Sequence, residues 1–379
     1  MSSQSISVSN DQLLNLSSGQ PDDAVIFRGD GEPISPQLLT SRLRNIMDST
    51  GMTADNYSRG GTVSQLETRF ADLLGKETSI FMPTGTLANH LAIRALCGHK
   101  TRAIVQEQSH IYNDTGDSTT RLSGINLVPL AQDLPCFTAD DVKVVIDKSE
   151  KGRVSNPVGA LLIESPVRRQ MGQIMPLDDM KAITSLCHEH GIGTHLDGAR
   201  IYMMAAASGI DIKEYCALFD TVYVSLYKYF GAPFGAILAG EHKLIDTMFH
   251  DRRMFGGGLA EAYCAAAIAL HEVEGFEGRF QQAIQKGRAL FKKLNLIPGI
   301  EIKEFEHGSN IFPLSFDSNI DIPRAAYDLQ QRGIYLYPDE GSDRYTKLTV
   351  NTTILRRTNE KIVQTFIETL NRPPLQTLS

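Results

Sequence analysis

Residues 221–240, TVYVSLYKYFGAPFGAILAG, decide the fold, because two apolar runs flank one lysine, Lys228. Each run, TVYVSL before the lysine and GAILAG after it, has the length and composition of a buried β-strand. Lys228 follows the first run directly and has aromatic and apolar neighbours. Because burial disfavours the charged form of an amine, we expect Lys228 to have a lowered pKa and to act as a neutral nucleophile. The alternative is an ordinary solvated lysine at the surface.

Similar apolar runs recur along the chain and alternate with helical patterns. The other predicted strands are TSIFMP, RAIVQE, INLVPL, VGALLIES and GIGTHLDG. Two predicted helices, SQLETRFADLLG and TLANHLAIRALCG, end at Gly75 and Gly98, and further helical patterns lie near 178–190 and 211–217. This alternation predicts an α/β fold with a mostly parallel, seven-stranded sheet.

The remaining sequence divides the chain into three parts. Residues 1–25 are rich in Ser, Asn and Gln and are predicted to form an N-terminal arm. The large domain is expected at 26–275 and ends with an apolar helix at 259–273. A small C-terminal α+β domain is expected at 276–379, with helices at 277–294 and 322–332 and strands near IEIKEF, NIFPLSF and YTKLTV.

Composition and charge narrow the class of function. The formal charge of −7 and the scattered Lys and Arg residues give no reason to expect a nucleic-acid surface. Nowhere do about 18 apolar residues follow one another, and the first residues do not resemble a secretory signal. The cysteines show no metal-binding spacing. We therefore expect a cytosolic enzyme acting on a small molecule, without a membrane or metal site.

Two further segments carry residues suited to ligand binding. Pro83-Thr84-Gly85-Thr86 follows a strand and opens a helix, so its backbone N–H groups and hydroxyls suit a phosphate dianion; an ordinary turn is the alternative. In HLDGAR, residues 195–200, a predicted parallel strand delivers Asp197 to the edge where α/β sheets bind ligands. Asp197 as a helix cap is the alternative there.

In their order along the chain, these segments resemble the threonine aldolase and aromatic amino acid beta-eliminating lyase family, over residues 26 to about 360. The resemblance rests on FMPTGTLAN, HLDGARIY, SLYKYFGAPFGAIL and DRRMFGGGLA. It implies fold type I, pyridoxal 5'-phosphate (PLP) as cofactor, an amino acid as substrate, and a homodimer or homotetramer with the cofactor near the subunit interface.

The resemblance also implies roles in holding the cofactor. Gly85 and Thr86 would bind its phosphate, and Asp197 its pyridine nitrogen, which makes the ring an electron sink. Lys228 would carry PLP as a Schiff base. His110, in QEQSHIYNDTG, would stack on the ring; a lone histidine is more often structural.

Two more roles follow from the resemblance. Arg200 would bind the substrate α-carboxylate, for which its fork-shaped guanidinium is matched. Tyr57, in ADNYSRGG, would reach the site of a neighbouring subunit; an ordinary half-buried tyrosine is the alternative.

The sequence departs from the family where threonine aldolases commonly carry a histidine near the substrate hydroxyl. That position is Val167 here, in ESPVRRQMG, and valine accepts no proton. Cleavage of the Cα–Cβ bond requires a base, for which His110 is the first substitute and Tyr57 the second. Arg168 and Arg169 would select an acidic or phosphorylated side chain, unless they are plain surface residues.

Two arginine positions of the family also differ. After Gly256-Gly257-Gly258 the chain continues with Leu259-Ala260-Glu261 instead of an arginine, for which Arg252 or Arg253 would compensate. Near the C-terminus, Lys347 in YTKLTVN stands where the family has a second arginine for the substrate carboxylate. Lysine lacks a bidentate fork, so we expect weaker or altered carboxylate binding.

The leading hypothesis is the reversible cleavage of a threonine-like β-hydroxy-α-amino acid to glycine and an aldehyde. The altered contacts leave a second hypothesis open, in which the same cofactor supports β-elimination, racemisation or another side-chain transformation. A third is a PLP-binding protein without catalytic activity.

Overall fold

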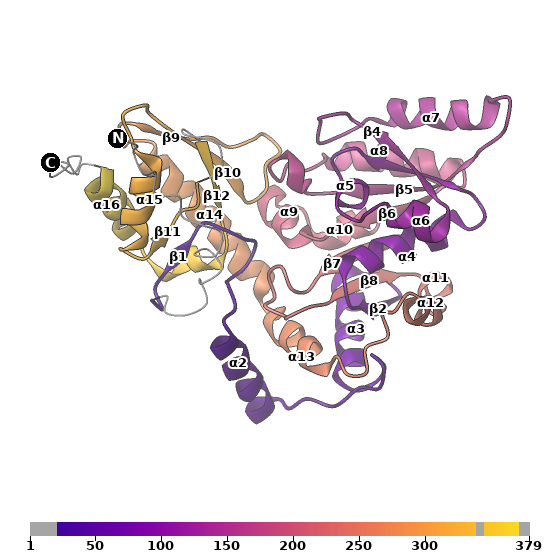
Figure 1. Cartoon of the computed structure of the whole chain (residues 1–379), viewed down its shortest axis with the longest axis horizontal. Coiled ribbons are helices and arrows are strands. Elements are labelled where there is room, and N and C mark those ends of the chain that lie inside the picture. Colours follow the sequence, from indigo (N-terminus) through magenta and orange to yellow (C-terminus); the bar gives the residue numbers. More distant parts are fainter. Residues whose placement is uncertain (1–20, 339–344, 371–379) are drawn as a thin grey trace, which may run out of the picture.

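The computed structural model describes residues 21–338 and 345–370, so most of the predicted N-terminal arm lies outside the described residues. The large domain is built on a seven-stranded sheet of order β2-β8-β7-β6-β5-β3-β4 (Figure 1). Its strands are β2 (Thr78–Met82), β3 (Arg102–Gln106), β4 (Asn126–Leu130), β5 (Val158–Glu164), β6 (Gly193–Asp197), β7 (Thr221–Ser225) and β8 (Ala236–Gly240). All seven lie within the predicted apolar runs.

Strand β8 gives the sheet its mixed character. It runs antiparallel to both β2 and β7, whereas β3, β4, β5, β6 and β7 pair in parallel. Parallel neighbours need a crossover of a dozen or more residues, and only residues 226–235 join β7 to β8. The predicted mostly parallel, seven-stranded sheet is thus confirmed, with one strand reversed by its short connection.

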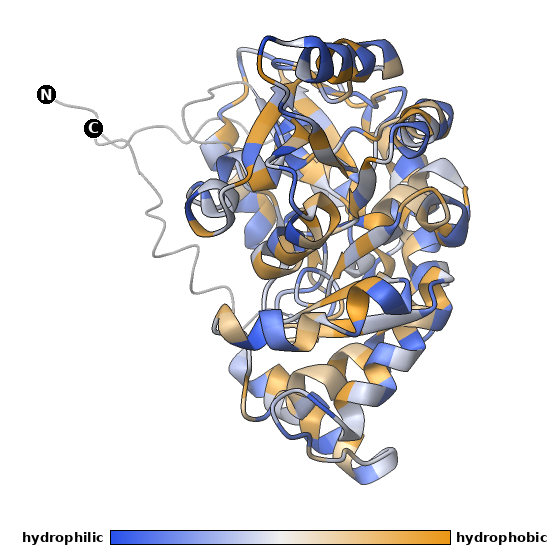
Figure 2. Cartoon of the chain, turned by 90° about the vertical axis from the view of Figure 1, so that its right-hand side faces the viewer, coloured by the Kyte–Doolittle hydropathy of each residue, from blue (hydrophilic) through white to orange (hydrophobic). Residues whose placement is uncertain are grey.

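Helices cover both faces of the sheet. Along β3, Ala103 and Val105 pack with Ile93 of helix α4 (Gly85–Cys97), whereas Ile104 belongs to the hydrophobic cluster on the opposite face with Ile183 of helix α8 (Leu177–Glu189). The central strands are largely apolar, and the helices around them carry both hydrophobic and hydrophilic residues (Figure 2). This pattern buries both faces of the strands, as expected for an α/β sheet.

The helices of the large domain include the predicted ones at 61–74, 85–97, 177–189 and 212–216, and others that were not predicted, among them the long helices at 36–49 and 139–151. They are α2 (Pro36–Ser49), α3 (Gly61–Leu74), α4 (Gly85–Cys97), α5 (His110–Asn113), α6 (Ser118–Ser123), α7 (Ala139–Lys151), η2 (Arg168–Gln170), α8 (Leu177–Glu189), α9 (Ile201–Ser208), α10 (Ile212–Cys216), α11 (His242–Ile245), α12 (Met248–Met254) and α13 (Tyr263–Glu272). Helix α3 ends at Gly75 in the left-handed conformation, as a C-terminal glycine allows.

The helix predicted at 259–273 begins only at Tyr263. A carboxylate oxygen of Asp55 accepts hydrogen bonds from the backbone N–H groups of Ala262 and Tyr263, both at 2.8 Å. Because a carboxylate satisfies the free N–H groups of a helix start, Asp55 fixes the beginning of α13 at this point.

The C-terminal region forms a three-stranded antiparallel sheet of order β12-β10-β9, at the left of Figure 1. Its elements are α14 (Phe276–Leu294), β9 (Ile300–Ile302), β10 (Ile311–Phe316), α15 (Ile322–Gln330), β11 (Ile334–Tyr335), β12 (Tyr345–Thr349), η3 (Thr352–Arg356) and α16 (Asn359–Leu370). Strand β1 (Val25–Ile26) pairs in parallel with β11, so the chain passes the small sheet before it enters the large domain. No helix in the described ranges is long and apolar enough to cross a lipid bilayer.

Candidate active site

Three segments meet at one edge of the large sheet and line a cavity of about 320 Å³. Helix α4 begins there after β2, β6 ends there at Asp197, and the loop after β7 brings Lys228. The cavity is lined by Pro83, Thr84, Gly85, Thr86, His110, Asp197, Tyr223, Tyr227, Lys228, Pro233, Phe234 and Gly235. The structure therefore brings together the predicted residues Gly85, Thr86, His110, Asp197 and Lys228.

The start of helix α4 forms one end of the cavity. The Thr84 hydroxyl oxygen caps the helix by accepting a hydrogen bond from the Leu87 N–H at 3.2 Å. Within the described residues, the backbone N–H groups of Gly85 and Thr86 have no acceptor. A Cβ atom on Gly85 would lie 2.0 Å from the Tyr223 hydroxyl oxygen, so only glycine fits at this position. The helix start thus presents free donors to an anion.

Asp197 lies at the end of β6 with both carboxylate oxygens held. Oδ1 accepts from the Ala199 N–H at 3.1 Å, and Oδ2 accepts from the side-chain amide of Asn89 at 2.5 Å. Asn89 belongs to helix α4, so this bond joins the anion-binding helix start to the carboxylate. The arrangement fixes the orientation of the Asp197 carboxylate toward the cavity that it lines.

A buried histidine continues this chain of hydrogen bonds away from the cavity. Nε2 of His195 lies 2.9 Å from Asn89 Oδ1, and Nδ1 lies 2.8 Å from the Thr221 hydroxyl. Burial lowers the pKa of His195 to about 4, so its ring is neutral at physiological pH. Because the Asn89 amide nitrogen donates to Asp197, its oxygen must accept, and we assign the proton of His195 to Nε2.

Lys228 is the amine of the cavity. Burial, and secondly the nearby Arg200 guanidinium, lower the pKa of Lys228 to about 8, against the opposing effect of Asp197 and Asp30. In the part of the chain that the structure describes, its Nζ has no hydrogen-bond acceptor. A substantial neutral fraction at physiological pH follows, which is the nucleophilic form of an amine.

His110 begins the short helix α5 beside the cavity. Its backbone N–H donates to a carboxylate oxygen of Glu164 at 2.6 Å, and the other oxygen of Glu164 accepts from the Arg168 N–H at 3.0 Å. Burial lowers the pKa of the His110 ring, against the opposing effect of Asp197. Burial, and secondly Asp197, raise the pKa of Glu164. Glu164 therefore ties the His110 helix to the loop that contains Val167.

Arg200 is not among the residues that line the cavity, and it forms an ion pair. Its Nε donates to Oδ2 of Asp30 at 2.7 Å, and the two side chains are 11% and 9% exposed. This partner was not predicted, since Asp30 lies 170 residues away in the sequence.

Four other predicted residues do not line this cavity. Tyr57 is 41% exposed, and the Arg253 guanidinium lies 4.3 Å from the centre of its ring. The exposed Arg169 pairs with Asp114 at 2.5 Å. Arg168 is exposed, and Lys347 lies on β12 of the small sheet.

Arg252 and Arg253 were proposed to replace the family arginine that is missing after Gly256-Gly257-Gly258. Of the two, Arg252 lies in the protein interior. It is 1% exposed and donates to the backbone carbonyl oxygens of Phe81, Tyr57 and Ser58. Arg253 is exposed and remains available at the surface. The main chain of Tyr57 is thus fixed by Arg252, and its ring contacts Arg253.

Several residues of the site were not predicted from the sequence. Asn89 stands within the segment FMPTGTLAN, three residues after Thr86, which is a helical spacing that turns it toward the sheet. Tyr227 precedes Lys228 and could have been named from its position alone. Tyr223, Glu164 and Asp30 carry no comparable signal.

Comparison with known proteins agrees with this geometry. The model of the family described as beta-eliminating lyase matches residues 39–315. The low-specificity L-threonine aldolase of Candida albicans is 29% identical over 221 residues, 58% of this chain and 58% of that protein. The alanine racemase TOXG of Cochliobolus carbonum is 30% identical over 263 residues, 68% of this chain and 65% of that protein. The chain thus matches less than two thirds of the length of either relative.

The solved structures extend the likeness over nearly the whole chain. A proposed L-allo-threonine aldolase of Listeria monocytogenes superposes with a TM-score of 0.77 at 28% identity, covering 92% of this chain and 96% of that one. The architecture is that of PLP fold type I enzymes, as the sequence predicted. The chain therefore belongs to the beta-eliminating lyase family, whose members depend on PLP, and is a threonine aldolase-like member of it.

Proposed function

We propose that this protein uses PLP to cleave a threonine-like β-hydroxy-α-amino acid to glycine and an aldehyde. One observation carries the proposal: the half-buried Lys228 shares a cavity with the fixed carboxylate of Asp197 and with N–H groups at the start of α4 that have no acceptor among the described residues. An aldehyde, a pyridine nitrogen and a phosphate are the three groups that such partners would bind.

The residues present fit PLP in detail. The Nζ of Lys228 would hold the cofactor covalently, and the N–H groups of Gly85 and Thr86 would bind its phosphate at the helix start. Asp197 would face the pyridine nitrogen, and His110 would lie against the ring. When bound, PLP withdraws electrons from the bonds at the substrate Cα.

The protein's own residues would then select and assist the reaction. Arg200 binds the α-carboxylate of the substrate through its guanidinium. The neutral ring of His110 accepts the proton of the β-hydroxyl as the Cα–Cβ bond breaks and the aldehyde leaves. The remaining Cα carbon takes up a proton, and the product is glycine.

A second candidate function is the breaking of the Cα–H bond, as in racemisation or β-elimination. Two observations favour it: Val167 is 0% exposed and offers no base near the substrate, and the relative from Cochliobolus carbonum is an alanine racemase. The side-chain contacts around the substrate decide which bond is broken. In this chain they differ from those of the family at Val167 and Lys347.

Product analysis separates the candidates. The PLP-loaded protein would be incubated with L-allo-threonine, L-threonine, L-serine, and L- and D-alanine, with Lys228→Ala as the control. Acetaldehyde and glycine from the threonines support the aldolase. Pyruvate from serine, or the opposite enantiomer from alanine, supports the second candidate. An absorbance that depends on Lys228 but responds to no amino acid would instead indicate a PLP-binding protein without catalysis.

We also propose that the protein works as a homodimer or homotetramer in which Tyr57 serves the site of a neighbouring subunit. In support, the ring of Tyr57 is exposed and contacts Arg253, while Arg252 fixes its main chain. A rigidly held exposed aromatic residue suits an interface.

A further inference from the structure

The ion pair of Asp30 and Arg200 assigns a role to a residue outside the cavity lining. We propose that Asp30 is a positioning residue: it holds Arg200 by Nε and thereby directs both terminal nitrogens of the guanidinium to the α-carboxylate of the substrate. The inference rests on the proposed function, because it requires an amino acid substrate.

The donors of Arg200 are divided between two tasks. Only Nε has a partner among the described residues, namely Oδ2 of Asp30 at 2.7 Å. The two terminal nitrogens have no acceptor within residues 21–338 and 345–370. They form the parallel pair of donors that grips a carboxylate in bidentate fashion. Asp30 thus binds the Nε side of the guanidinium, which leaves both terminal nitrogens for a bidentate carboxylate.

Asp30 is the carboxylate available for this purpose. Glu164 accepts from the backbone N–H groups of His110 and Arg168, and Asp197 accepts from Asn89 and a backbone N–H. Asp30 is bound to Arg200 with both side chains about nine-tenths buried. A buried guanidinium that loses its partner is strongly disfavoured, so the pair should hold a single geometry.

The main chain around Asp30 is fixed on the side of the large domain. A Cβ atom on the neighbouring Gly31 would lie 2.6 Å from the Cα of Tyr229 and 2.9 Å from the carbonyl oxygen of Lys228. Gly31 therefore lies directly against the backbone of the lysine segment. The position of Asp30, next to Gly31 in the sequence, is thereby fixed relative to the main chain of Lys228.

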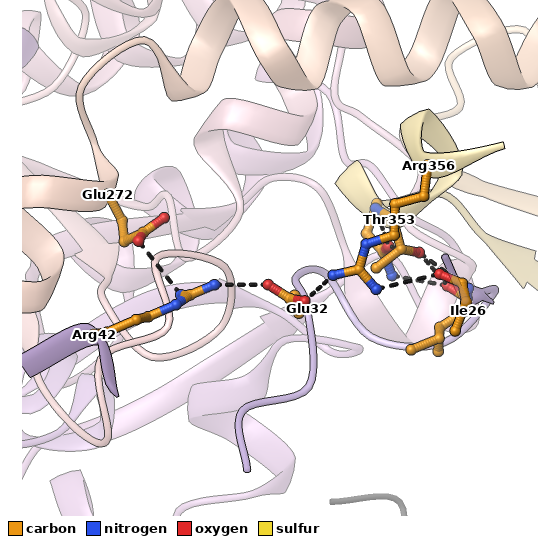
Figure 3. A network of polar contacts seen from close by, with 8 residues as sticks. Ile26, Glu32, Arg42, Glu272, Thr353 and Arg356 are labelled. Carbon is orange, nitrogen blue, oxygen red and sulfur yellow. Dashed lines mark hydrogen bonds and ion pairs between the residues drawn. The ribbon is translucent and has the colours of Figure 1, made fainter. Parts of the chain in front are cut away.

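The same segment is fixed on the side of the small sheet. The side-chain amide of Asn351 donates to the carbonyl oxygens of Arg28 and Gly29, both at 3.1 Å. Glu32 lies between Arg42 and Arg356 and binds both of them (Figure 3). Since the main chain is held without the side chain of Asp30, a substitution there should change the orientation of Arg200 and leave the segment in place.

The test compares glycine with glycinamide, which has the amine but not the carboxylate. Dissociation constants would be measured for the PLP-loaded protein from the change of its visible absorbance. The variants are Asp30→Ala, Asp30→Asn, which keeps an acceptor for Nε–H, and Glu32→Gln as a matched control for a paired carboxylate in the same segment.

We expect Asp30→Ala to weaken glycine binding roughly tenfold or more, since a charge-assisted contact loses its geometry, and to leave glycinamide within about threefold of wild type. Asp30→Asn should bind glycine within about threefold of wild type, as should Glu32→Gln.

Three results would overturn the assignment: glycine binding to Asp30→Ala that matches wild type, an equal loss for glycinamide, or an equal loss in Glu32→Gln. If the wild-type protein itself responds to neither ligand, the proposed function fails together with this inference. If wild type binds glycine and Asp30→Ala binds it equally well, only the role of Asp30 fails.

Discussion

Replacing Gly85 by alanine should displace the anion-binding start of α4 while the rest of the fold remains. The added Cβ would lie 2.0 Å from the hydroxyl oxygen and 2.3 Å from Cζ of Tyr223. Ordinary contacts begin at 3.4 Å, so the two elements must separate by about 1.4 Å. Tyr223 is 2% exposed and its main chain is held in β7, so we expect the helix start to be the part that moves.

The magnitude follows from this shift. A hydrogen bond to a charged group contributes about 1.5–3 kcal/mol, so loss of one phosphate contact at the displaced helix start should weaken PLP binding by about 10- to 100-fold. The extra atom in a packed interior should lower the free energy of unfolding by about 1–3 kcal/mol. The PLP affinity is therefore expected to change more than stability alone explains.

The assay combines PLP titration, followed by visible absorbance, with urea unfolding of the same preparations. Gly278→Ala is the matched control, since Gly278 lies within helix α14 and nothing lies within 4 Å of its added Cβ. That variant should gain about 0.5–1 kcal/mol of stability and bind PLP as wild type does. If Gly85→Ala binds PLP with wild-type affinity, the assignment of the α4 start to the phosphate is wrong.

Three further predictions concern the amine, the carboxylate and the subunit contact. The rate at which the apoprotein takes up PLP should rise with pH, because Lys228 is neutral above its pKa, and should be half-maximal near pH 8; a flat profile contradicts this. Asn89→Ala should lower the free energy of unfolding in urea by about 2–4 kcal/mol, since Asp197 and His195 both lose a buried partner; a loss below about 0.5 kcal/mol would refute the network. Finally, inactive Tyr57→Ala and Lys228→Ala proteins should regain activity when dissociated and reassembled together, and no recovery would contradict a shared site.

Much of the fold was predictable because the decisive signals are local. Each buried strand is an apolar run of a few residues, and each run precedes a turn or helix signal. Asp197 and Lys228 were each predicted at the end of a strand, and the family resemblance implied that both hold one cofactor. The reversal of β8 was also readable, since ten residues between two strands cannot form a crossover, although the alternation alone favoured a parallel strand.

The site residues that were not predicted depend on contacts between residues that are distant in the sequence. Asp30 meets Arg200 across 170 positions, and nothing in the sequence around Asp30 indicates an ion pair. Tyr223 matters only because its ring lies beneath Gly85, a contact set by the packing of α4 on the sheet. Side-chain pairing of this kind follows from the tertiary arrangement, which periodicity does not encode.

The pairing of charges around the cavity suits Lys228 for its proposed role as the nucleophile. Three carboxylates and two cations lie close together, and each carboxylate already has its donors: Asp30 has Arg200, whereas Asp197 and Glu164 have amide and backbone N–H groups. The amine of Lys228 is left without an acceptor among the described residues, while burial and Arg200 disfavour its charge. A carboxylate bound directly to Nζ would keep the amine protonated and unreactive. Because the neighbouring acids have donors of their own and none binds Nζ, burial and Arg200 outweigh their effect on the pKa of Lys228, which favours the neutral amine in the proposed role.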